Sequence, residues 1–493
     1  MKTKNKILST IVAASMLTLF NCNEDFLDTE PTEFLTAEQV AEAAANNPGV
    51  IAGSMAGIYT LQFQTETGGS DDHDDFGQKG YDIYLDMLCG DMALSTNGYN
   101  WYRSLTEYQD TQDFTQIRNR KPWRYYYRLI RSANTVIDAL GGQDVTPDLD
   151  ANKWIMGQAK AIRAHSYFYL TQLYSNKYEP NAEILPLYTT AADQNGPKVT
   201  TQVIFDLMIS DLTESITLLD GFTRTAKNQI NKSVAQGTLA YVYAGMGNWT
   251  EAAALTNDVI TSGGYSLATS AETVGGFNDV NTPGWMWGVD ITLDNGLDLV
   301  SWWGQVDVYT YSYAWAGDSK AIDLDLYNSI PANDIRKSQF LNDPSSTYYL
   351  LPFSKFYDPG RVVGGQRNVT TDYVYMRVAE MYLLNAEANA RLGADGLART
   401  SLKSVLDLRV PTSAYVDALS GQALLDEVYY QTRLELWGEG KSYFAMKRNQ
   451  ATITRGANHL SNVGVQTAYD DEKLSLEIPE DEIQNNPFIG TQN

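Results

Sequence analysis

The chain has 493 residues, of which 12% are aromatic, and a formal net charge of −24. This aromatic content argues against intrinsic disorder over most of the length, because disordered chains lack the residues that build a core. The acidic total excludes a general nucleic-acid surface, which needs clustered Lys and Arg, although a local basic patch can survive within it.

The N-terminus has the layout of a secretory signal. Three lysines in the first six residues precede an uncharged, largely apolar run over residues 7–20, which is too short to span a bilayer as a stable helix. The run ends at Leu19-Phe20-Asn21-Cys22, as in bacterial lipoprotein signals. We therefore predict a signal peptide over residues 1–21, lipidation at Cys22 and a tether over residues 22–50. Asn21 stands where Gly, Ala or Ser is usual, and an ordinary signal peptide with an incidental Cys is the alternative.

Helical periodicity dominates the part of the chain after the tether. Apolar residues recur every three or four positions in "PWRYYYRLIRSANTVIDALGG", which stops at Gly141, and again in "GQAKAIRAHSYFYLTQLYSN" and "TQVIFDLMISDLTESITLLDG". Each of these runs predicts an amphipathic helix.

A repeat follows in "QGTLAYVYAGMGNWTEAAALTNDVI", which resembles a tetratricopeptide unit. Ala240 and Ala252 allow two antiparallel helices to approach closely, and Gly247-Asn248 forms the turn. The run "AEMYLLNAEANARLGADGLARTSLKSVL" repeats this arrangement around Gly393. Because such units bury their faces on their neighbours, we predict a mainly α fold in which the helix pairs form a superhelix.

Residues about 265–365 break the helical pattern with Gly, Asp, Asn and Pro, which predicts short strands and long loops. The alternation in "WMWGVDITL" predicts a strand, and Asp294-Asn295-Gly296 predicts a three-residue hairpin loop. That register pairs Leu293 with Leu297, Ile291 with Leu299 and Trp287 with Trp303.

The same register sorts the tryptophans of this region. It places Trp285, Trp287 and Trp303 on the apolar face, where we predict core, whereas Trp302 points the other way and is free to meet a ligand. Farther along, "DVYTYSYAW" places four aromatic residues two apart, which predicts an exposed aromatic comb if the segment is extended. Aromatic faces pack on the C–H face of a pyranose, so such a comb suits sugars; the alternative is that it covers a helix.

A further aromatic candidate is Trp101, in the Asn-rich and loop-like "NGYNWYR" with Tyr99 and Tyr102. The predicted ligand-binding residues are therefore Trp101, Trp302, Tyr309, Tyr311, Tyr313 and Trp315.

Metal and enzyme sites find little support. If Cys22 carries the lipid, Cys89 has no partner for a disulfide or a cysteine metal site and reads as a small buried residue. Three histidines cannot build a His-rich site, and His165 lies inside a predicted helix as packing. The "DDHDD" run at residues 71–75 reads as a solvated acidic loop in preference to a calcium site. No G-x-S-x-G or H-E-x-x-H motif occurs, so we predict no catalytic residue, cofactor or metal.

Three blocks close the chain: "TTDYVYMRVAEMYLLNAEANARLG", "LLDEVYYQTRLELWGEGKSYFAMKRNQ" and "LSLEIPEDEIQNNPFIGTQN". With the lipoprotein start, the helical runs and the tetratricopeptide-like middle, this ordered set resembles the SusD/RagB family, the surface nutrient-capture lipoproteins of Bacteroidetes-type bacteria. The acidic start after Cys22 (Asn23, Glu24 and Asp25) also resembles the surface-export signal of such lipoproteins.

The resemblance implies one SusD-like domain over residues 51–493, in which four tetratricopeptide-like units support an irregular ligand-binding region. It implies a lipid anchor in the outer membrane, exposure at the cell surface and a SusC-like TonB-dependent transporter as partner. Ligands of the family are commonly oligosaccharides or polysaccharides, and its members are not enzymes. The alternatives are a peptide or other non-sugar nutrient as ligand, and a carbohydrate-active enzyme.

The resemblance also singles out charged residues in the shared blocks. We expect them to be structural, pairing with one another or with helix ends. They are Arg163, Arg377, Glu380, Glu387, Arg433, Glu435 and Glu439.

Overall fold

The computed structural model describes residues 47–493. The predicted signal peptide, Cys22 and most of the predicted tether lie outside the described residues. Among the residues that are described, no helix is both long and apolar enough to cross a membrane.

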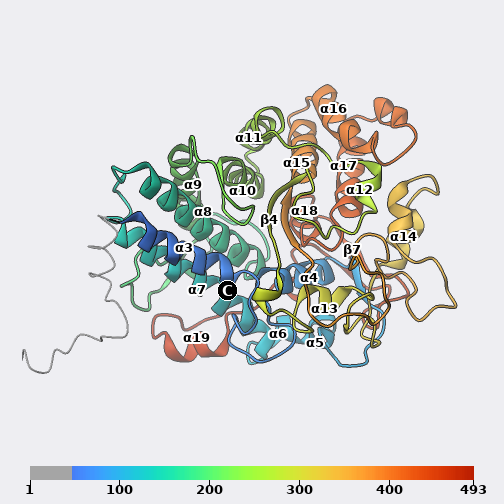
Figure 1. The fold of residues 1–493 in the computed structure, drawn as a ribbon, viewed down its shortest axis with the longest axis horizontal. Helices are drawn as coiled ribbons and strands as arrows, with labels where there is room; N and C mark the ends of the chain where they lie inside the picture. Colours follow the sequence, from blue (N-terminus) through green and yellow to red (C-terminus); the bar gives the residue numbers. More distant parts are fainter. Residues whose placement is uncertain (1–46) are drawn as a thin grey trace, which may run out of the picture.

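The predicted helices are confirmed, and they pack in chain order (Figure 1). From α7 to α11 each helix packs on the next, α11 then packs directly on α15, and α15 contacts both α16 and α17. The principal helices are α3 (Pro48–Leu61), α4 (Gln78–Leu88), α7 (Ile117–Ala139), α8 (Asp150–Leu173), α9 (Thr201–Leu218), α10 (Lys232–Gly245), α11 (Trp249–Ser262), α15 (Val378–Arg391), α16 (Asp395–Leu406), α17 (Gly421–Glu435) and α18 (Ser442–Arg448).

Local sequence explains why these helix pairs turn where they do. Gly247 has a φ of +78° between α10 and α11, and Gly393 has a φ of +73° between α15 and α16. These left-handed conformations carry a steric cost for residues with a Cβ, so glycine is the residue that ends each first helix cleanly. Both predicted tetratricopeptide-like units are thus helix pairs joined at the predicted glycines.

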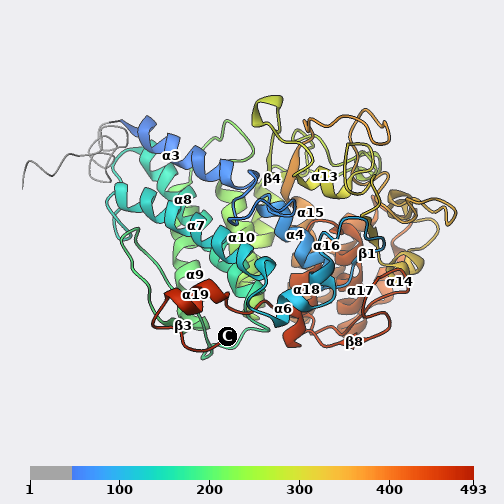
Figure 2. The same ribbon diagram turned by 90° about the horizontal axis from the view of Figure 1, so that it is seen from below.

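The region between α11 and α15 is an insertion into this stack. It contains short elements joined by long loops, as the sequence predicts, and Figures 1 and 2 both place α13 beside α4. The remaining short α-helices within residues 47–493 are α5 (Arg103–Thr106), α6 (Gln109–Gln112), α12 (Ser270–Thr273), α13 (Trp302–Val306), α14 (Leu324–Ser329) and α19 (Glu480–Asn485).

In the described part of the chain, eight short strands form four antiparallel pairs: β1 with β5, β2 with β3, β4 with β6, and β7 with β8. The β1–β5 pair joins the inserted region to the segment that follows α4, whereas the β4–β6 pair joins an early part of the inserted region to its end. The strands are β1 (Met92–Leu94), β2 (Glu183–Pro186), β3 (Lys198–Thr200), β4 (Trp285–Val289), β5 (Lys320–Ile322), β6 (Tyr373–Arg377), β7 (Ile453–Thr454) and β8 (Gln466–Thr467).

The predicted hairpin around residues 294–296 is wrong. Strand β4 pairs with β6, so Trp285 faces Arg377 and Trp287 faces Met376. The segment Leu293–Asn295 forms a 3-10 turn that ends at Gly296, whose φ is +67°. The glycine therefore does adopt the predicted left-handed conformation, but the chain that follows does not return along β4.

The charged residues of the shared blocks pair as expected. Arg377 lies 3.1 Å from a Glu435 oxygen and 2.7 Å from a Glu439 oxygen, and Arg409 lies 2.8 Å from Glu435. Glu380 accepts a hydrogen bond from the Arg377 N–H and so caps the start of α15. The other pairs are Arg163 with Asp211, Arg433 with Asp91, and Glu387 with both Arg391 and Arg448.

Two further predictions concern single buried residues. Cys89 is free and buried, as predicted. His165 lies in α8 against the rings of Tyr169 and Trp287. Burial, and to a smaller extent the positive charge of Lys441, lower the pKa of His165 to about 3. The imidazole is therefore a neutral packing group.

Candidate functional site

Strand pairing brings together two segments that lie more than 200 residues apart. In β1 and β5, Met92 faces Ile322 and Leu94 faces Lys320. The backbone contact continues past the strands, because the Gly98 N–H donates to the Gly317 carbonyl at 2.9 Å. The residues that follow β1 are therefore held against those that precede β5.

The result is an aromatic cluster built from three segments. The Trp101 ring stacks on His73 with centroids 5.3 Å apart and an interplanar angle of 5°. Tyr313 meets Trp101 edge to face at 5.8 Å and Tyr99 at 5.1 Å, and its hydroxyl is hydrogen-bonded to His73 Nδ1. Tyr99 is 53% exposed and Trp101 is half-buried, so the cluster presents rings to solvent.

A second pair of rings extends this surface. Tyr311 and Trp315 lie 5.4 Å apart and are 40% and 37% exposed. A Cβ added to Gly364 would lie 2.5 Å from the Trp315 indole, so the ring rests on bare backbone there. We call Tyr99, Trp101, Tyr311 and Trp315, with His73 and Tyr313 beside them, the aromatic site.

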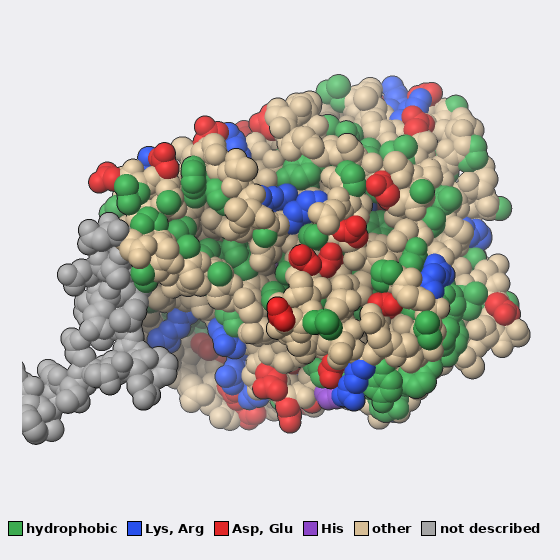
Figure 3. Space-filling view, in the orientation of Figure 1, with side chains coloured by type: hydrophobic (Ala, Val, Ile, Leu, Met, Phe, Trp, Pro, Cys, Tyr) green, Lys and Arg blue, Asp and Glu red, His purple; other side chains and the backbone are tan. Residues whose placement is uncertain are grey.

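Figure 3 shows hydrophobic side chains gathered at the lower right, over the loops beside α13.

The loop that carries the second ring pair is organised by Asp307. Its carboxylate accepts hydrogen bonds from the backbone N–H groups of Tyr309 at 2.9 Å and Asp358 at 3.0 Å. Burial outweighs these hydrogen bonds and raises the pKa of Asp307 to about 7.

The predicted comb is not extended, and its four rings point to different places. Tyr309 and Tyr313 are each 6% exposed, whereas Tyr311 and Trp315 remain accessible. Turns explain the difference: the Ala316 N–H donates to the Ser312 carbonyl, and the Tyr313 N–H donates to Gly304. Tyr309 lies beneath Arg361, whose guanidinium is 4.9 Å from its ring.

The prediction that Trp302 is free to meet a ligand is also wrong. This side chain is 2% exposed and packs edge to face on Phe356 at 4.5 Å and on Trp303 at 5.0 Å. The error follows from the wrong hairpin, because residue 302 begins helix α13 and does not lie on a strand. Trp285, Trp287 and Trp303 are buried, as predicted.

The acidic run at residues 71–75, predicted as a solvated loop, is anchored by ion pairs and backbone hydrogen bonds. The buried Asp74 pairs with Lys121 and Arg118, and these cations lower its pKa although burial acts in the opposite direction. Asp75 accepts hydrogen bonds from the Gly68 and Ser70 N–H groups. This anchoring fixes His73, which the sequence offered only as one of three histidines. Within residues 47–493 no group of three or more His, Cys, Asp or Glu is placed to hold a metal.

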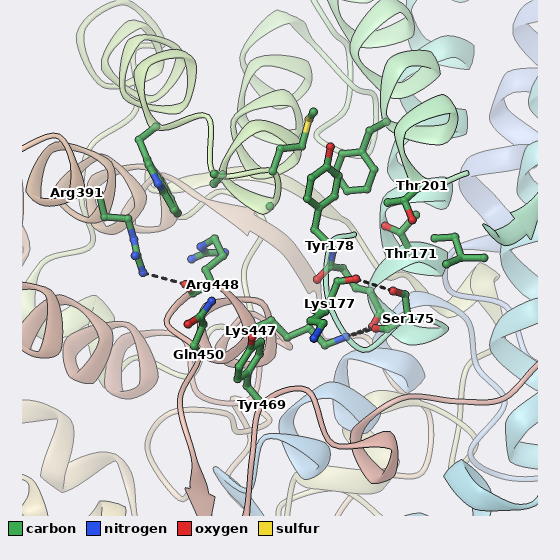
Figure 4. Close-up of a pocket in the computed structure, with 18 residues that line it drawn as sticks. Thr171, Ser175, Lys177, Tyr178, Thr201, Arg391, Lys447, Arg448, Gln450 and Tyr469 are labelled. Carbon is green, nitrogen blue, oxygen red and sulfur yellow. Dashed lines mark hydrogen bonds between the residues drawn. The ribbon is translucent and has the colours of Figure 1, made fainter. Parts of the chain in front are cut away.

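A separate cavity of about 360 Å³ lies in the helical part of the molecule (Figure 4). The C-terminal ends of α8, α10, α15 and α18 meet there, and helix C-termini carry partial negative charge. Lys447 donates to the carbonyls of Gln172 and Ser175, and Arg391 donates to the Arg448 carbonyl. The other two cations that line the cavity pair with carboxylates, Arg448 with Glu387 and Lys177 with Glu179 and Asp470. Because its cations are already engaged, we do not assign this cavity as the ligand site.

The chain is similar to several known proteins. One family model, described as "Starch-binding associating with outer membrane", matches residues 72–244, and a second, "SusD family", matches residues 307–491. Together they cover more than half of the chain.

A curated relative from Formosa agariphila, "SusD-like protein P25", is 21% identical over 300 residues, which are 59% of this chain. The match spans only about half of that relative, 53% of its length.

Solved structures share the fold. A SusD-like carbohydrate binding protein from Bacteroides vulgatus is 24% identical, with a TM-score of 0.73 over 90% of this chain and 97% of that one. A SusD superfamily protein from the same species is 21% identical, with a TM-score of 0.75 over 90% of this chain and 98% of that one.

Proposed function

Since this chain belongs to the SusD/RagB family, we propose that it is a glycan-binding lipoprotein that captures nutrient at the cell surface and delivers it to a SusC-like TonB-dependent outer-membrane transporter. The observation that carries the proposal is the aromatic site. Tyr99, Trp101, Tyr311 and Trp315 present their rings there from two segments that the β1–β5 pair holds together.

The chemistry of these rings suits a carbohydrate. Aromatic rings offer an apolar face with a polar edge, and the C–H face of a sugar packs on the first while its hydroxyls bond to the second. The site is preorganised, because Trp101 is stacked on His73 and Trp315 rests on Gly364. Preorganised side chains lose little conformational entropy on binding, which favours affinity.

The anchoring and transport parts of the proposal have their own tests. Metabolic labelling with a fatty acid should mark the wild-type protein and leave Cys22→Ser unlabelled. The labelled protein should co-purify with a TonB-dependent transporter from detergent extracts of outer membranes. Recovery of an unacylated, freely periplasmic product contradicts this part of the proposal.

Binding is tested by titrating neutral oligosaccharides into wild-type protein and into Trp101→Ala and Trp315→Ala. Each substitution should weaken binding about tenfold, since a well-placed aromatic contact contributes about 1.4 kcal/mol. Trp249→Ala is the matched control, because this half-buried tryptophan lines the cavity of Figure 4 and lies outside the aromatic site.

Equal binding by wild type and both site variants, or a loss in Trp249→Ala alone, would overturn the site. A peptide that binds where no sugar does would select the non-sugar alternative. Hydrolysis of a sugar by the pure protein would establish the enzyme alternative.

A further inference from the structure

Three arginines form a row on one exposed face of α7. Arg124, Arg128 and Arg131 are four and three residues apart, a spacing that places side chains on the same side of a helix. The row extends roughly 10 Å along the helix axis. It is a local basic feature on a chain whose net charge is −24. Figure 3 shows Lys and Arg side chains gathered at the lower left, where Figure 1 places α7.

These arginines differ from the cations that precede them in the same helix. Arg118 and Lys121 are paired with Asp74, and Arg120 lies 2.7 Å from an Asp481 oxygen. Among residues 47–493, the side chains of the row form neither an ion pair nor a hydrogen bond. A guanidinium carries five N–H donors in a planar fork, so the row offers its donors to something outside the described fold.

The row lines a groove of about 570 Å³, a volume typical of small-molecule sites. One wall of the groove is aromatic. The ring centroids of Trp123 and Tyr127 are 4.8 Å apart, and Tyr127 meets Tyr188 edge to face with centroids 5.6 Å apart. Tyr127 and Tyr188 are half-buried and line the groove. We call this space the arginine groove.

Carboxylates also line the arginine groove, and two of them are already engaged. Asp193 accepts hydrogen bonds from the Thr189 and Thr190 N–H groups, and Glu482 accepts one from Trp123 Nε1 at 3.3 Å. The third, Glu66, is exposed at the rim. Their presence disfavours a densely charged polyanion and favours a ligand in which single negative groups alternate with neutral ones.

We propose that the arginine groove is a second saccharide site, which binds a carboxylate- or sulfate-bearing sugar unit of the captured glycan. The inference rests on the proposed function. The guanidinium fork binds a planar or tetrahedral oxyanion through two parallel hydrogen bonds, and the tyrosines supply a surface for the ring.

One loop links the arginine groove to the aromatic site. A Cβ added to Gly69 would lie 2.7 Å from Arg124 Cζ, while His73, four residues later, stacks on Trp101. A glycan long enough to reach across this loop contacts neutral rings at one end and guanidinium groups at the other. The two sites together therefore select an acidic oligosaccharide with neutral units.

The test uses full-length mature protein and two matched ligand pairs: a galacturonate oligomer with its methyl ester, and a sulfated galactan oligomer with its desulfated form. At least one charged member should bind more tightly than its neutral partner, and added salt should weaken that difference. Arg128→Gln should reduce the affinity for that charged member about tenfold or more, because it removes hydrogen bonds that a charged donor makes to a charged acceptor.

Arg399→Gln is the control, because it removes the same charge from a half-buried arginine on α16. Equal affinity for the charged and neutral members of both pairs, or equal loss in the two arginine variants, overturns the groove. If neutral oligosaccharides bind in a Trp101-dependent way but the charged members bind no more tightly, the proposed second saccharide site is wrong and the proposed function stands. If no saccharide binds at all, the proposed function and the groove both fall.

Discussion

The helical stack and the inserted region between α11 and α15 both bury charged side chains, but they use them differently. In the stack, Arg163 of α8 pairs with Asp211 of α9. Glu435 of α17 pairs with Arg409, and also with Arg377 and Arg336 from the inserted region, so charge meets charge where the helices contact their neighbours. In the inserted region, Asp307 and Asp372 accept hydrogen bonds from backbone N–H groups that belong to no helix or strand ladder.

Backbone satisfaction explains the difference. Helix interiors pair their own N–H and C=O groups, so buried ions there serve to orient one helix against another. Loops leave N–H groups unpaired, and a buried carboxylate is a compact way to satisfy two of them at once. The pKa values follow: the arginines hold the pKa of Glu435 well below its ordinary value despite burial, whereas burial raises the pKa of Asp372 to about 6.

The largest expected effect is in the stack. Glu435→Ala leaves three buried guanidinium groups without their shared carboxylate and should lower the free energy of unfolding by about 5 kcal/mol. Denaturant unfolding followed by circular dichroism measures the loss. Asp417→Ala is the control, because it breaks the largely exposed Lys403–Asp417 pair and should lose less than about 1 kcal/mol. Similar losses in the two variants would show that the buried cluster does not orient the helices.

Asp307 of the inserted region and Glu435 of the stack should change the free energy of unfolding in opposite directions as pH rises. The pKa of Asp307 rises from an ordinary 3.8 to about 7 on folding, so between these values the folded state binds more protons than the unfolded state. Stability from this group is therefore full below pH 3.8 and is lost as pH rises towards 7, by at most about 1.4 kcal/mol per pH unit. Glu435, whose pKa is depressed, contributes stability that is present above its ordinary pKa of 4.5 and is lost as pH falls.

Denaturant unfolding of wild type and Asp307→Asn across this range measures the difference. The variant should lose part of the downward slope with rising pH, whatever its absolute stability, because an amide does not titrate. An unchanged slope in Asp307→Asn would mean that the carboxylate is ionised throughout and that burial does not control it.

The same contrast decides what the sequence could predict. Helices α7 to α10 follow from apolar spacing, and Gly141, Gly247 and Gly393 mark the ends of α7, α10 and α15. These predictions are possible because each signal lies within a few residues of the structure it predicts. The charged residues of the C-terminal blocks could be predicted to pair, since an isolated charge on an apolar helix face has no other stable arrangement.

The inserted region depends on partners that no local pattern reveals. Strand β4 finds β6, about 85 residues away along the chain, and Tyr313 finds His73 across 240 residues. The local hairpin signal at residues 294–296 was real as a turn, but the tertiary pairing overrode it. Trp101, Tyr311 and Trp315 could be proposed as ligand residues from composition, whereas Trp302 could not be placed without knowing that α13 begins there.

The smallest expected effect on stability comes from Gly364→Ala, which should displace the Trp315 ring without removing it. Gly364 has a φ of +62°, and Gly364→Ala would bring a Cβ to 2.5 Å from the Trp315 indole, so the ring must move. The backbone strain should lower the free energy of unfolding by about 1–2 kcal/mol, and oligosaccharide affinity should fall about fivefold because Trp315 leaves its bound position. Gly296→Ala is a close control, since its φ of +67° imposes the same strain while an added Cβ meets no atom within 4 Å. Oligosaccharide titration and indole fluorescence compare the two variants. A fall in affinity for Gly364→Ala alone places the ligand on the Trp315 ring, whereas equal affinities mean that Tyr311 and Trp315 do not contact the ligand.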